Sequence, residues 1–541
     1  MLQDKRGIGF SIRALRCNSL LVGLLLIVLL PGVLSVIVGT SLGLASCTDV
    51  GYPDSAILLR IGEFVKLGRL YPDINHPPYL VNIYGPLTYV LGSVLYGMAQ
   101  AVGIHPQLLL RLGAVSTLCF CILLVYLLGR RLSDSRVTAV FCALFATSTL
   151  PLADWSTQLR GDFLALLCSL FALYLFLQGN KHGRWVGAAV CAGMAPLVKQ
   201  TFLAVPIAVV IWLVYRRQYR GAASWAGTFA FVVGAGYTLA WWREPLMLQH
   251  IAALRDPILE YRQALDFILA AISQPVVPFA AVGGFCVFWK GAPEHRLLLL
   301  YGALGWCMAA LAVFHVGGNI NYFWEPLFAS SVLAGLGLNE LRVKAHRTPV
   351  SVTVALLLAV SWMFLPTLRG EVGYLRQCYL RVRSYGTCKA NWELFLSIVS
   401  GRKLLSTFPG VTFHSRVPEI PDPYLNSCLE IHGRWTSRPV AKQIGAGAYE
   451  LVVIQVGQAD NAIHYRGIRK WSDDMWFALR RAYEPVCVLE DMPSMTGGVS
   501  ESLEVWLPRL GSAELFGKLS AMGCHPVSRR LDGDGTTHTR P

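Results

Sequence analysis

Apolar runs of membrane length recur along the chain up to residue 367, separated by short polar or charged connections. The first run, 20–38, follows a basic stretch at residues 1–19. Ten more lie near 112–129, 137–152, 163–178, 185–197, 201–215, 222–242, 266–289, 297–315, 323–340 and 349–367. A helix needs about 20 apolar residues to cross a bilayer. The pattern therefore predicts a polytopic α-helical membrane protein with about eleven transmembrane helices, some of them short.

The stretch 84–102 is also apolar, but the distribution of charge predicts that it does not cross. Cytoplasmic loops carry an excess of Lys and Arg. If 84–102 lies in the interface, thirteen basic residues share one side, in the loops 130–136, 179–184, 216–220, 290–296 and 342–347, and the loops opposite carry five. If it crossed, every later loop would change sides. We therefore expect a juxtamembrane helix that begins at Gly85-Pro86, a cytoplasmic N-terminus, and polar loops gathered on the extracytoplasmic side.

The sequence changes character after residue 367. Apolar runs shorten to strand length, as in 450–456, while charged residues, Pro and Trp become more frequent. We expect a small extracytoplasmic α/β domain, in which some of the five tail cysteines could pair. The expected division is a cytoplasmic N-terminus (1–19), a transmembrane domain (20–367) with its first extracytoplasmic loop at 39–111, the α/β domain (368–526) and a disordered tail (527–541).

Composition agrees with a membrane protein and limits the partners. Hydrophobic residues make up 54% of the chain and charged residues 15%, and the mean hydropathy is +0.49. Soluble domains carry about a quarter charged residues, so that class is excluded. The formal net charge of +15 is typical of cytoplasmic loops and of contacts with anionic membrane lipids. We expect no nucleic-acid binding, because no compact basic domain with interleaved aromatic residues occurs.

A polar stretch at 46–86 directly follows the first apolar run and holds Asp49, Asp54, Glu63 and Asp73. Ionisable groups placed against a membrane are candidates for function. A carboxylate there can act as a general base towards a hydroxyl, bind a metal or pair with a cation. The alternative is an ordinary solvated loop.

Basic residues next to predicted helices could bind an anion. Arg111 opens the run at 112–129, Arg160 lies in a loop, and Lys199 occupies a very short connection between two apolar helices. A lysine there is costly unless it meets an anion, so a phosphate partner is favoured. For Arg111 the alternative is an interfacial anchor.

Polar side chains at two predicted helix starts complete the candidates. Asp162 follows Arg160 and could simply cap its helix. The segment 317–325 joins amides to aromatic residues and an acid, which suits sugar hydroxyls and ring faces, although capping and an interfacial aromatic belt would explain it too. No P-loop and no HExxH motif occurs. Acids, cations and a polar-aromatic patch on one side together fit group transfer from a lipid-linked phosphate.

In their order and spacing these motifs resemble the GT-C superfamily of membrane glycosyltransferases. The most similar branch is the bacterial one related to protein O-mannosyltransferases and lipid A aminoarabinose transferases. The matching membrane-part motifs are Asp49 with Asp54, Gly68-Arg-Leu-Tyr-Pro-Asp73, Tyr84-Gly-Pro-Leu87, Arg111, Leu159-Arg-Gly-Asp162, Lys199-Gln-Thr201 and Asn321-Tyr-Phe-Trp-Glu325. Those of the tail are Pro421-Asp-Pro-Tyr424, Gly433-Arg-Trp435 and Tyr449-Glu-Leu-Val-Val453.

The resemblance implies transfer of one sugar from a polyprenyl-phosphate donor to a hydroxyl of an envelope glycan, lipid or protein. The reaction would take place at the outer face of the bacterial inner membrane, with inversion. By position, Asp49 would be the general base, and Asp54 would assist it or orient the acceptor. Many relatives carry Glu where this chain has Asp54, so either acid could be the base.

The resemblance also implies a set of binding residues. Donor-phosphate ligands would be Arg111, Arg160 and Lys199. Sugar or acceptor ligands would be Tyr84, Asp162, Gln200, Asn321, Tyr322 and Glu325. We expect no metal site or cofactor, since these cations could stabilise a leaving phosphate, whereas relatives with pyrophosphate donors use a divalent cation.

Two other classes fit part of the pattern. A transporter or flippase of a lipid-linked sugar would show an internal repeat and acids at mid-membrane in broken helices. The sequence shows no repeat, and its acids lie at predicted helix ends. In a non-catalytic scaffold the acids of the first loop would have no chemical role.

Overall fold

The computed structural model describes residues 5–46, 54–149, 151–179, 182–252, 261–290, 292–314, 318–344, 350–420, 423–455, 471–493, 500–509 and 513–526. The chain folds as two compact units. We call Met1–Pro72 with Asn82–Leu380 the membrane unit, and Asp73–Val81 with Arg381–Pro541 the C-terminal unit. The expected boundary at 367/368 therefore falls inside the membrane unit, and a short piece of the first loop belongs to the C-terminal unit.

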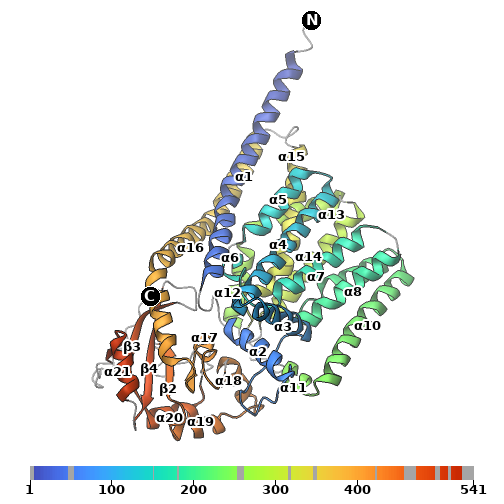
Figure 1. Cartoon of the computed structure of the whole chain (residues 1–541). Helices are drawn as coiled ribbons and strands as arrows, with labels where there is room; N and C mark the ends of the chain where they lie inside the picture. The colour runs from blue at the N-terminus through green and yellow to red at the C-terminus, as the bar shows by residue number, and fades with distance from the viewer. Residues whose placement is uncertain are drawn as a thin grey trace. The chain divides into compact units, whose positions relative to one another are not determined.

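The described part of the membrane unit is helical (Figure 1). Its helices are α1 (Lys5–Ala45), α2 (Asp54–Leu67), α3 (Pro86–Ala101), α4 (Pro106–Ser133), α5 (Arg136–Thr147), α6 (Pro151–Trp155), α7 (Asp162–Leu177), α8 (His182–Val198), α9 (Ala204–Tyr215), α10 (Tyr219–Arg243), α11 (Met247–Ile251), α12 (Tyr261–Ile272), α13 (Val276–Lys290), α14 (Pro293–Ala312), the 3-10 helix η2 (Ile320–Phe323), α15 (Trp324–Lys344) and α16 (Val350–Val399). α16 runs unbroken from the membrane unit into the C-terminal unit.

The core of the membrane unit lies around α15, which packs against α13, α5 and α14. Gly283 and Gly337 allow α13 and α15 to approach closely, since a Cβ on Gly283 would overlap the carbonyl oxygen of Leu333. Small residues at helix crossings are typical of bundles in lipid, where close packing drives association. Trp324 and Phe328 fill the space at the start of α15 and are fully buried. This places η2 and the first turn of α15 at a rigid position.

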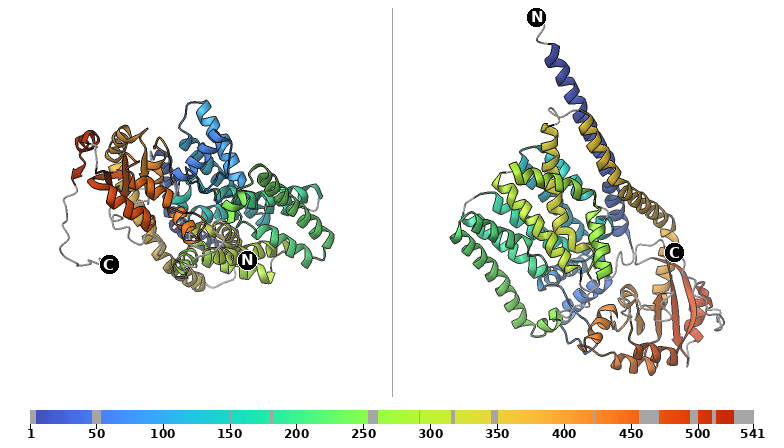
Figure 2. Two further views of the ribbon diagram at one scale, coloured as in Figure 1. Left: turned by 90° about the horizontal axis from the view of Figure 1, so that it is seen from below. Right: turned by 180° about the vertical axis from the view of Figure 1, so that it is seen from behind.

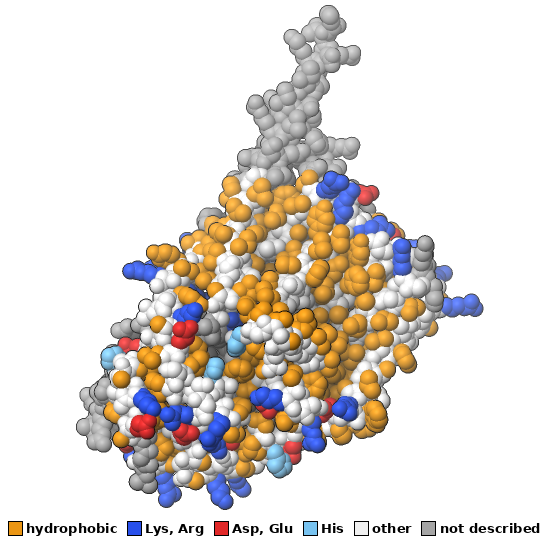
Figure 3. All heavy atoms as spheres, viewed as in Figure 1, with side chains coloured by type: hydrophobic (Ala, Val, Ile, Leu, Met, Phe, Trp, Pro, Cys, Tyr) orange, Lys and Arg blue, Asp and Glu red, His pale blue; other side chains and the backbone are white. Residues whose placement is uncertain are grey.

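On the face seen in Figure 3, apolar side chains cover a broad part of the surface of the membrane unit. Among the described residues, three helical segments are long and apolar enough to cross a membrane: Leu25–Ala45, Pro106–Ser133 and Pro293–Ala312. Four shorter apolar helices are α5, α7, α8 and α9. The chain is thus a membrane protein with several apolar helices, and the number eleven stays a prediction.

Two predicted spans are wrong in detail. The single span at 266–289 is two helices, α12 and α13, which meet at 69°. Pro275 lies at the break. Proline has no N–H to donate and disfavours the helical conformation in the residue before it, Gln274. The side-chain amide of Gln274 donates to Ala270 O at 3.0 Å. The span at 137–152 ends at Thr147, and α6 follows as a separate short helix.

The helix predicted at 84–102 is present as α3, with Gly85 as its N-cap and Pro86 in its first turn. Proline suits that position because its missing N–H would have no helical partner there and its φ is already helical. That α3 lies in the membrane interface and does not cross the membrane stays a prediction.

The C-terminal unit holds a five-stranded mixed sheet with helices beside it (Figures 1 and 2). The strands β1 (Leu404–Ser406), β2 (Leu451–Gln455), β3 (Tyr483–Pro493), β4 (Ser500–Pro508) and β5 (His525–Pro526) lie in the order β1-β2-β4-β3-β5. Only the β1–β2 pair is parallel. Its helices, besides the end of α16, are α17 (Pro409–Thr412), α18 (Pro423–Ile431), α19 (Arg438–Gly445), α20 (Asp473–Ala482) and α21 (Ala513–Ala521). The predicted tail at 527–541 lies outside the described residues.

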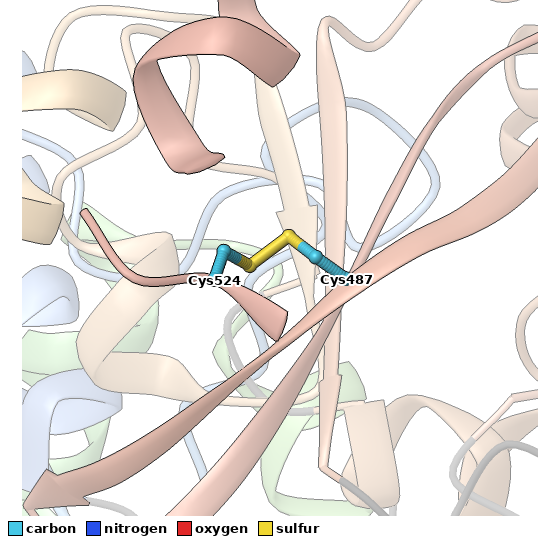
Figure 4. Close-up of a disulfide and its surroundings, with 2 residues drawn as sticks. All are labelled: Cys487 and Cys524. Atoms are coloured by element: carbon cyan, nitrogen blue, oxygen red, sulfur yellow. A yellow bond between two sulfur atoms is a disulfide. The ribbon is translucent and has the colours of Figure 1, made fainter. Parts of the chain in front are cut away.

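A disulfide joins Cys487 on β3 to Cys524, just before β5 (Figure 4). It closes a loop with a sequence separation of 37 residues that contains β4 and α21. The other described tail cysteines, Cys378, Cys388 and Cys428, are buried. One pair therefore forms among the five tail cysteines whose pairing the sequence left open.

Candidate active site

Asp54 opens α2 and is almost fully buried, at 1% exposure. Its Oδ1 accepts a hydrogen bond from the Leu159 N–H at 2.8 Å, and its Oδ2 lies 3.6 Å from a guanidinium nitrogen of Arg111. An acid in the first turn also interacts favourably with the helix dipole. Asp54 therefore fixes the start of α2 against the loop before α7. Asp49, the other predicted catalytic acid, lies outside the described residues.

Arg111 lies in the second turn of α4 and is also 1% exposed. Its Nη1 donates to the carbonyl oxygens of Gly43 at 3.0 Å and Ser46 at 2.7 Å. These carbonyls end α1, where a helix leaves acceptors without a helical partner. Arg111 thus ties three helices together, and these described contacts occupy groups that the sequence assigned to a donor phosphate.

Lys199, Asp162 and Asn321 form a second buried cluster. The Lys199 ammonium pairs with Asp162 Oδ1, and Asn321 Nδ2 donates to the same oxygen at 2.8 Å. The ammonium also lies 4.4 Å from the ring centroid of Tyr322. Asp162 therefore holds Lys199 and η2 together, which goes beyond the capping role that its helix-start position would explain.

Close backbone packing brings these segments together. Gly85 N–H donates to Val198 O at 3.0 Å, and a Cβ on Gly85 would overlap the carbonyl oxygen of Leu197. Thr88 Oγ1 donates to Val198 O as well, at 2.9 Å. A Cβ on Gly161 would come within 2.7 Å of Thr88 Oγ1. The start of α3, the end of α8 and the turn before α7 can meet only because two glycines stand at the contact.

Tyr84, Gln200 and Arg160 lie around this cluster. Burial raises the pKa of the Tyr84 phenol, which lies within electrostatic range of Arg160, Asp162 and Lys199. Gln200 Nε2 donates to Ile83 O at 3.2 Å and so fixes the backbone before Tyr84. The Arg160 guanidinium stacks 4.4 Å from the ring centroid of Trp155. The structure thus brings together eight of the predicted site residues in two clusters joined by 159–162: Asp54, Tyr84, Arg111, Arg160, Asp162, Lys199, Asn321 and Tyr322, with Gln200 at their edge.

Glu325 stands apart from the other predicted ligands. It lies in the first turn of α15, and its carboxylate faces Ser169 of α7 and Tyr301 of α14. Ser169 is about two helical turns, or roughly 10 Å, further along α7 than Asp162. Glu325 therefore belongs to a deeper polar layer of the bundle rather than to the cluster around Lys199.

Comparison with known proteins sets these clusters on a recognised scaffold. Residues 94–242 match the family model described as dolichyl-phosphate-mannose-protein mannosyltransferase. The structure matches the crystal structure of ArnT from Cupriavidus metallidurans bound to undecaprenyl phosphate, with a TM-score of 0.56 and 12% sequence identity. That match covers 90% of this chain and 98% of the ArnT chain. The fold is that of the GT-C glycosyltransferases.

The apo form of ArnT from the same organism gives the same TM-score of 0.56, at 13% identity and the same coverage. Among proteins of curated function, none matches the sequence significantly. The predicted resemblance to the GT-C superfamily is confirmed at the level of the fold, and the structural match covers 90% of this chain.

Three buried polar residues of the membrane unit were not predicted from the sequence. Arg60 lies on α2 at 2% exposure. Glu244 accepts from the N–H of Leu70 at 2.9 Å, and His250 on α11 is 0% exposed. Arg60 carried a usable signal, since an arginine on an otherwise apolar helix face is unusual. The partners of Glu244 and His250 are far away in the sequence, so no local pattern indicates them.

Metal ligation has no visible basis within the part of the chain that the structure describes. No group of three or more His, Cys, Asp or Glu side chains there could hold a metal ion. Among the described charges within electrostatic range of Tyr84, Lys199 and Arg160 are cations and Asp162 is an anion. The absence of a cofactor stays a prediction.

Proposed function

We propose that this protein is an integral membrane glycosyltransferase. It moves one sugar from a polyprenyl-phosphate donor to a hydroxyl of an envelope glycan, lipid or protein, at the outer face of the bacterial inner membrane. The observation that carries the proposal is the buried Lys199–Asp162–Asn321 cluster on a GT-C fold. The bound undecaprenyl phosphate named for the ArnT structure supports a lipid phosphate as the ligand.

The described contacts of the cluster leave some of its hydrogen-bond donors and acceptors unused. Lysine has three N–H donors, of which the described hydrogen bonds of Lys199 use one. Asp162 Oδ2 and Asn321 Oδ1 are buried and have no hydrogen-bond partner among the described residues. Buried polar atoms are normally satisfied, so a ligand with both an anion and hydroxyl groups would complete them. A sugar joined to a phosphate has both.

The reaction needs a base and a group that stabilises the leaving phosphate. The acceptor hydroxyl gives its proton to a carboxylate while its oxygen attacks the anomeric carbon, and the bond from that carbon to the phosphate oxygen breaks. We assign the negative charge that develops on the phosphate to Lys199 and Arg160, because preorganised cations lower the barrier most where charge develops. A single displacement of this kind inverts the anomeric centre.

We assign proton abstraction to Asp49 and a positioning role to Asp54. Asp54 already binds the Leu159 N–H and faces Arg111, so its carboxylate is committed to the protein. It would hold the start of α2, which Asp49 precedes in the sequence.

The orientation is part of the same proposal. The disulfide between Cys487 and Cys524 supports an extracytoplasmic C-terminal unit, because such bonds persist in oxidising compartments. The charge distribution of the loops supports a cytoplasmic N-terminus.

The test is transfer of radiolabelled sugar from polyprenyl-phosphate donors, in membranes that contain the wild type or single variants at equal amounts. We expect Asp49→Asn and Lys199→Met to lose transfer by at least about a hundredfold, as is usual when a base or a stabilising charge is removed. Glu63→Gln is the matched control, because Glu63 lies on α2 and pairs only with the exposed Lys66 among described contacts. Full activity of Lys199→Met would remove this cluster from the reaction.

A further inference from the structure

The imidazole of His250 holds two separate points of the first loop. Its Nδ1 accepts a hydrogen bond from the Asn82 N–H at 3.0 Å, and its Nε2 lies 2.6 Å from the carbonyl oxygen of Pro72. A carbonyl only accepts, so Nε2 carries the proton and the ring is neutral in this arrangement. One fully buried side chain thus satisfies two backbone groups that are ten positions apart in the sequence.

Pro72 and Asn82 are the two residues at which the chain leaves and re-enters the membrane unit. The excursion between them, Asp73–Val81, folds with the C-terminal unit. There Ile420 N–H donates to Pro78 O at 3.1 Å, and Asn426 Nδ2 donates to Tyr79 O at 3.2 Å. His250 therefore joins the two ends of this excursion, while other residues bind its middle.

Glu244 stabilises the chain segment that leads into the excursion. Its carboxylate accepts from the N–H groups of Leu70 at 2.9 Å and Tyr71 at 3.4 Å. Tyr71 packs edge-on against the imidazole of His250, with 5.3 Å between ring centroids. Glu244 at the end of α10 and His250 on α11 thus both bind the chain just before the excursion.

Tyr71 passes this constraint to the candidate active site. Its hydroxyl donates to the backbone carbonyl of Tyr84 at 3.1 Å, and the phenol of Tyr84 lies within electrostatic range of Lys199 and Asp162. Asn82 is only two residues before Tyr84. Both routes from His250, through Tyr71 and through Asn82, therefore end at the same residue of the site.

We propose that His250 is a positioning residue for the transfer reaction. By binding both Pro72 and Asn82, its imidazole fixes the two chain segments that end at Pro72 and begin at Asn82, and so fixes the position of Tyr84 relative to Lys199 and Asp162. The inference rests on the proposed function, because it assigns these two segments a part in sugar transfer. His250 touches neither substrate nor reacting atoms and acts through Tyr84.

The first measurement is backbone hydrogen exchange of full-length protein in lipid nanodiscs, read for the segment 68–86. We expect Asn82 to be protected in the wild type and to exchange at least about tenfold faster in His250→Ala, since a lost hydrogen bond exposes its donor. His250→Asn retains an acceptor near the Nδ1 position and should keep part of the protection. His76→Asn is the control, because His76 lies in the excursion and is exposed. Equal protection of Asn82 in wild type and His250→Ala would overturn the proposal.

The second measurement is the steady-state kinetics of sugar transfer by the same variants. We expect His250→Ala to lower kcat/KM for the donor roughly ten- to hundredfold, with partial recovery in His250→Asn, as small misplacements of a site cost about this much. Tyr71→Phe combined with His250→Asn should depart from the sum of the two single effects, because both act through Tyr84. A purely structural role would instead lower the amount of folded protein and leave kcat/KM unchanged.

The outcomes separate the two proposals. No transfer by the wild type from any polyprenyl-phosphate sugar would overturn the proposed function. Normal wild-type transfer with unchanged kcat/KM in His250→Ala would overturn the role of His250 and leave the proposed function standing.

Discussion

Buried charge is the defining feature of this molecule at the scale of single residues. Lys199 and Asp162 are 6% and 2% exposed and pair with each other, and Asp54 and Arg111 are both 1% exposed. Taking such groups out of water costs several kcal/mol for each ion, which only close pairing offsets. A water-exposed position would be less costly for both pairs. Buried pairs of this kind are weak evidence for stability, and Asp54 and Arg111 also hold the backbone at Leu159, Gly43 and Ser46.

The first prediction concerns Asp162→Asn. The substitution leaves the Lys199 ammonium buried without its counter-charge, so we expect a loss of about 3–5 kcal/mol in the free energy of unfolding. Thermal unfolding in detergent measures the effect. The control is Glu63→Gln, which breaks the exposed pair with Lys66 and should cost less than about 1 kcal/mol. Equal melting temperatures for the two variants would show that Asp162 does not neutralise Lys199.

Element ends, rather than element middles, build the site. The starts of α2, α3 and α7, the end of α8 and η2 carry the side chains in question. Glycines at these ends permit backbone contact, as at Gly85, whose Cβ would overlap the Leu197 carbonyl. The site geometry therefore depends on how closely the helix ends approach one another.

The second prediction compares Gly85→Ala with Gly97→Ala. Both replace a glycine of α3 or its N-cap, but a Cβ on Gly97 meets no atom within 4 Å. We expect Gly85→Ala to lose about 1–3 kcal/mol, because backbone must move to make room, together with most of the transfer activity. Gly97→Ala should be neutral or slightly stabilising. If both variants melt and turn over alike, the contact between α3 and α8 does not shape the site.

Sequence patterns predicted these elements well where their signal is local. The start of α3 at Gly85-Pro86 was predicted because proline has a fixed conformational preference. The bend at Pro275 was missed, because a continuous apolar run outweighed a single proline in the pattern. A second proline was outweighed in the same way, because the predicted span at 137–152 joined α5 to the start of α6 at Pro151.

Long-range contacts explain what the sequence could not predict of the site. Lys199 and Asp162 were singled out because a charge within an apolar context is visible in the sequence itself. Glu325 looked equivalent to Asn321, but one helical turn carries it to Ser169 and Tyr301. His250 was missed because its partners Asn82 and Pro72 are 168 and 178 positions away. Residue type can be read locally, whereas the partner of a buried polar group cannot.

At the scale of the whole molecule, a membrane unit with a GT-C fold is joined to a unit with a disulfide. The broken helix pair α12 and α13 is the feature that a transporter would share, since discontinuous helices mark transport sites. Its break carries Gln274 and Pro275 but no ionisable residue. The acids and cations of the candidate site lie at other helix ends, which favours an enzyme over a flippase.

The third prediction concerns the disulfide of the C-terminal unit. Closing a loop of 37 residues should stabilise this unit by roughly 4 kcal/mol through the entropy of the unfolded chain. The double variant Cys487→Ala/Cys524→Ala should therefore make the C-terminal unit more sensitive to protease in full-length protein. Cys307→Ala is the control, because Cys307 is a free, exposed thiol of the membrane unit. Equal protease sensitivity in both variants would show that the bond contributes little.

The most direct test of the central claim follows the bond between sugar and phosphate. Purified protein is placed in proteoliposomes with a polyprenyl-phosphate sugar labelled in the sugar and an envelope extract as acceptor. The account predicts that each labelled sugar reaching the acceptor releases one molecule of free polyprenyl phosphate, and that Lys199→Met abolishes both products together. Intact labelled donor appearing on the opposite leaflet, with no polyprenyl phosphate released, would contradict the account and identify a flippase instead.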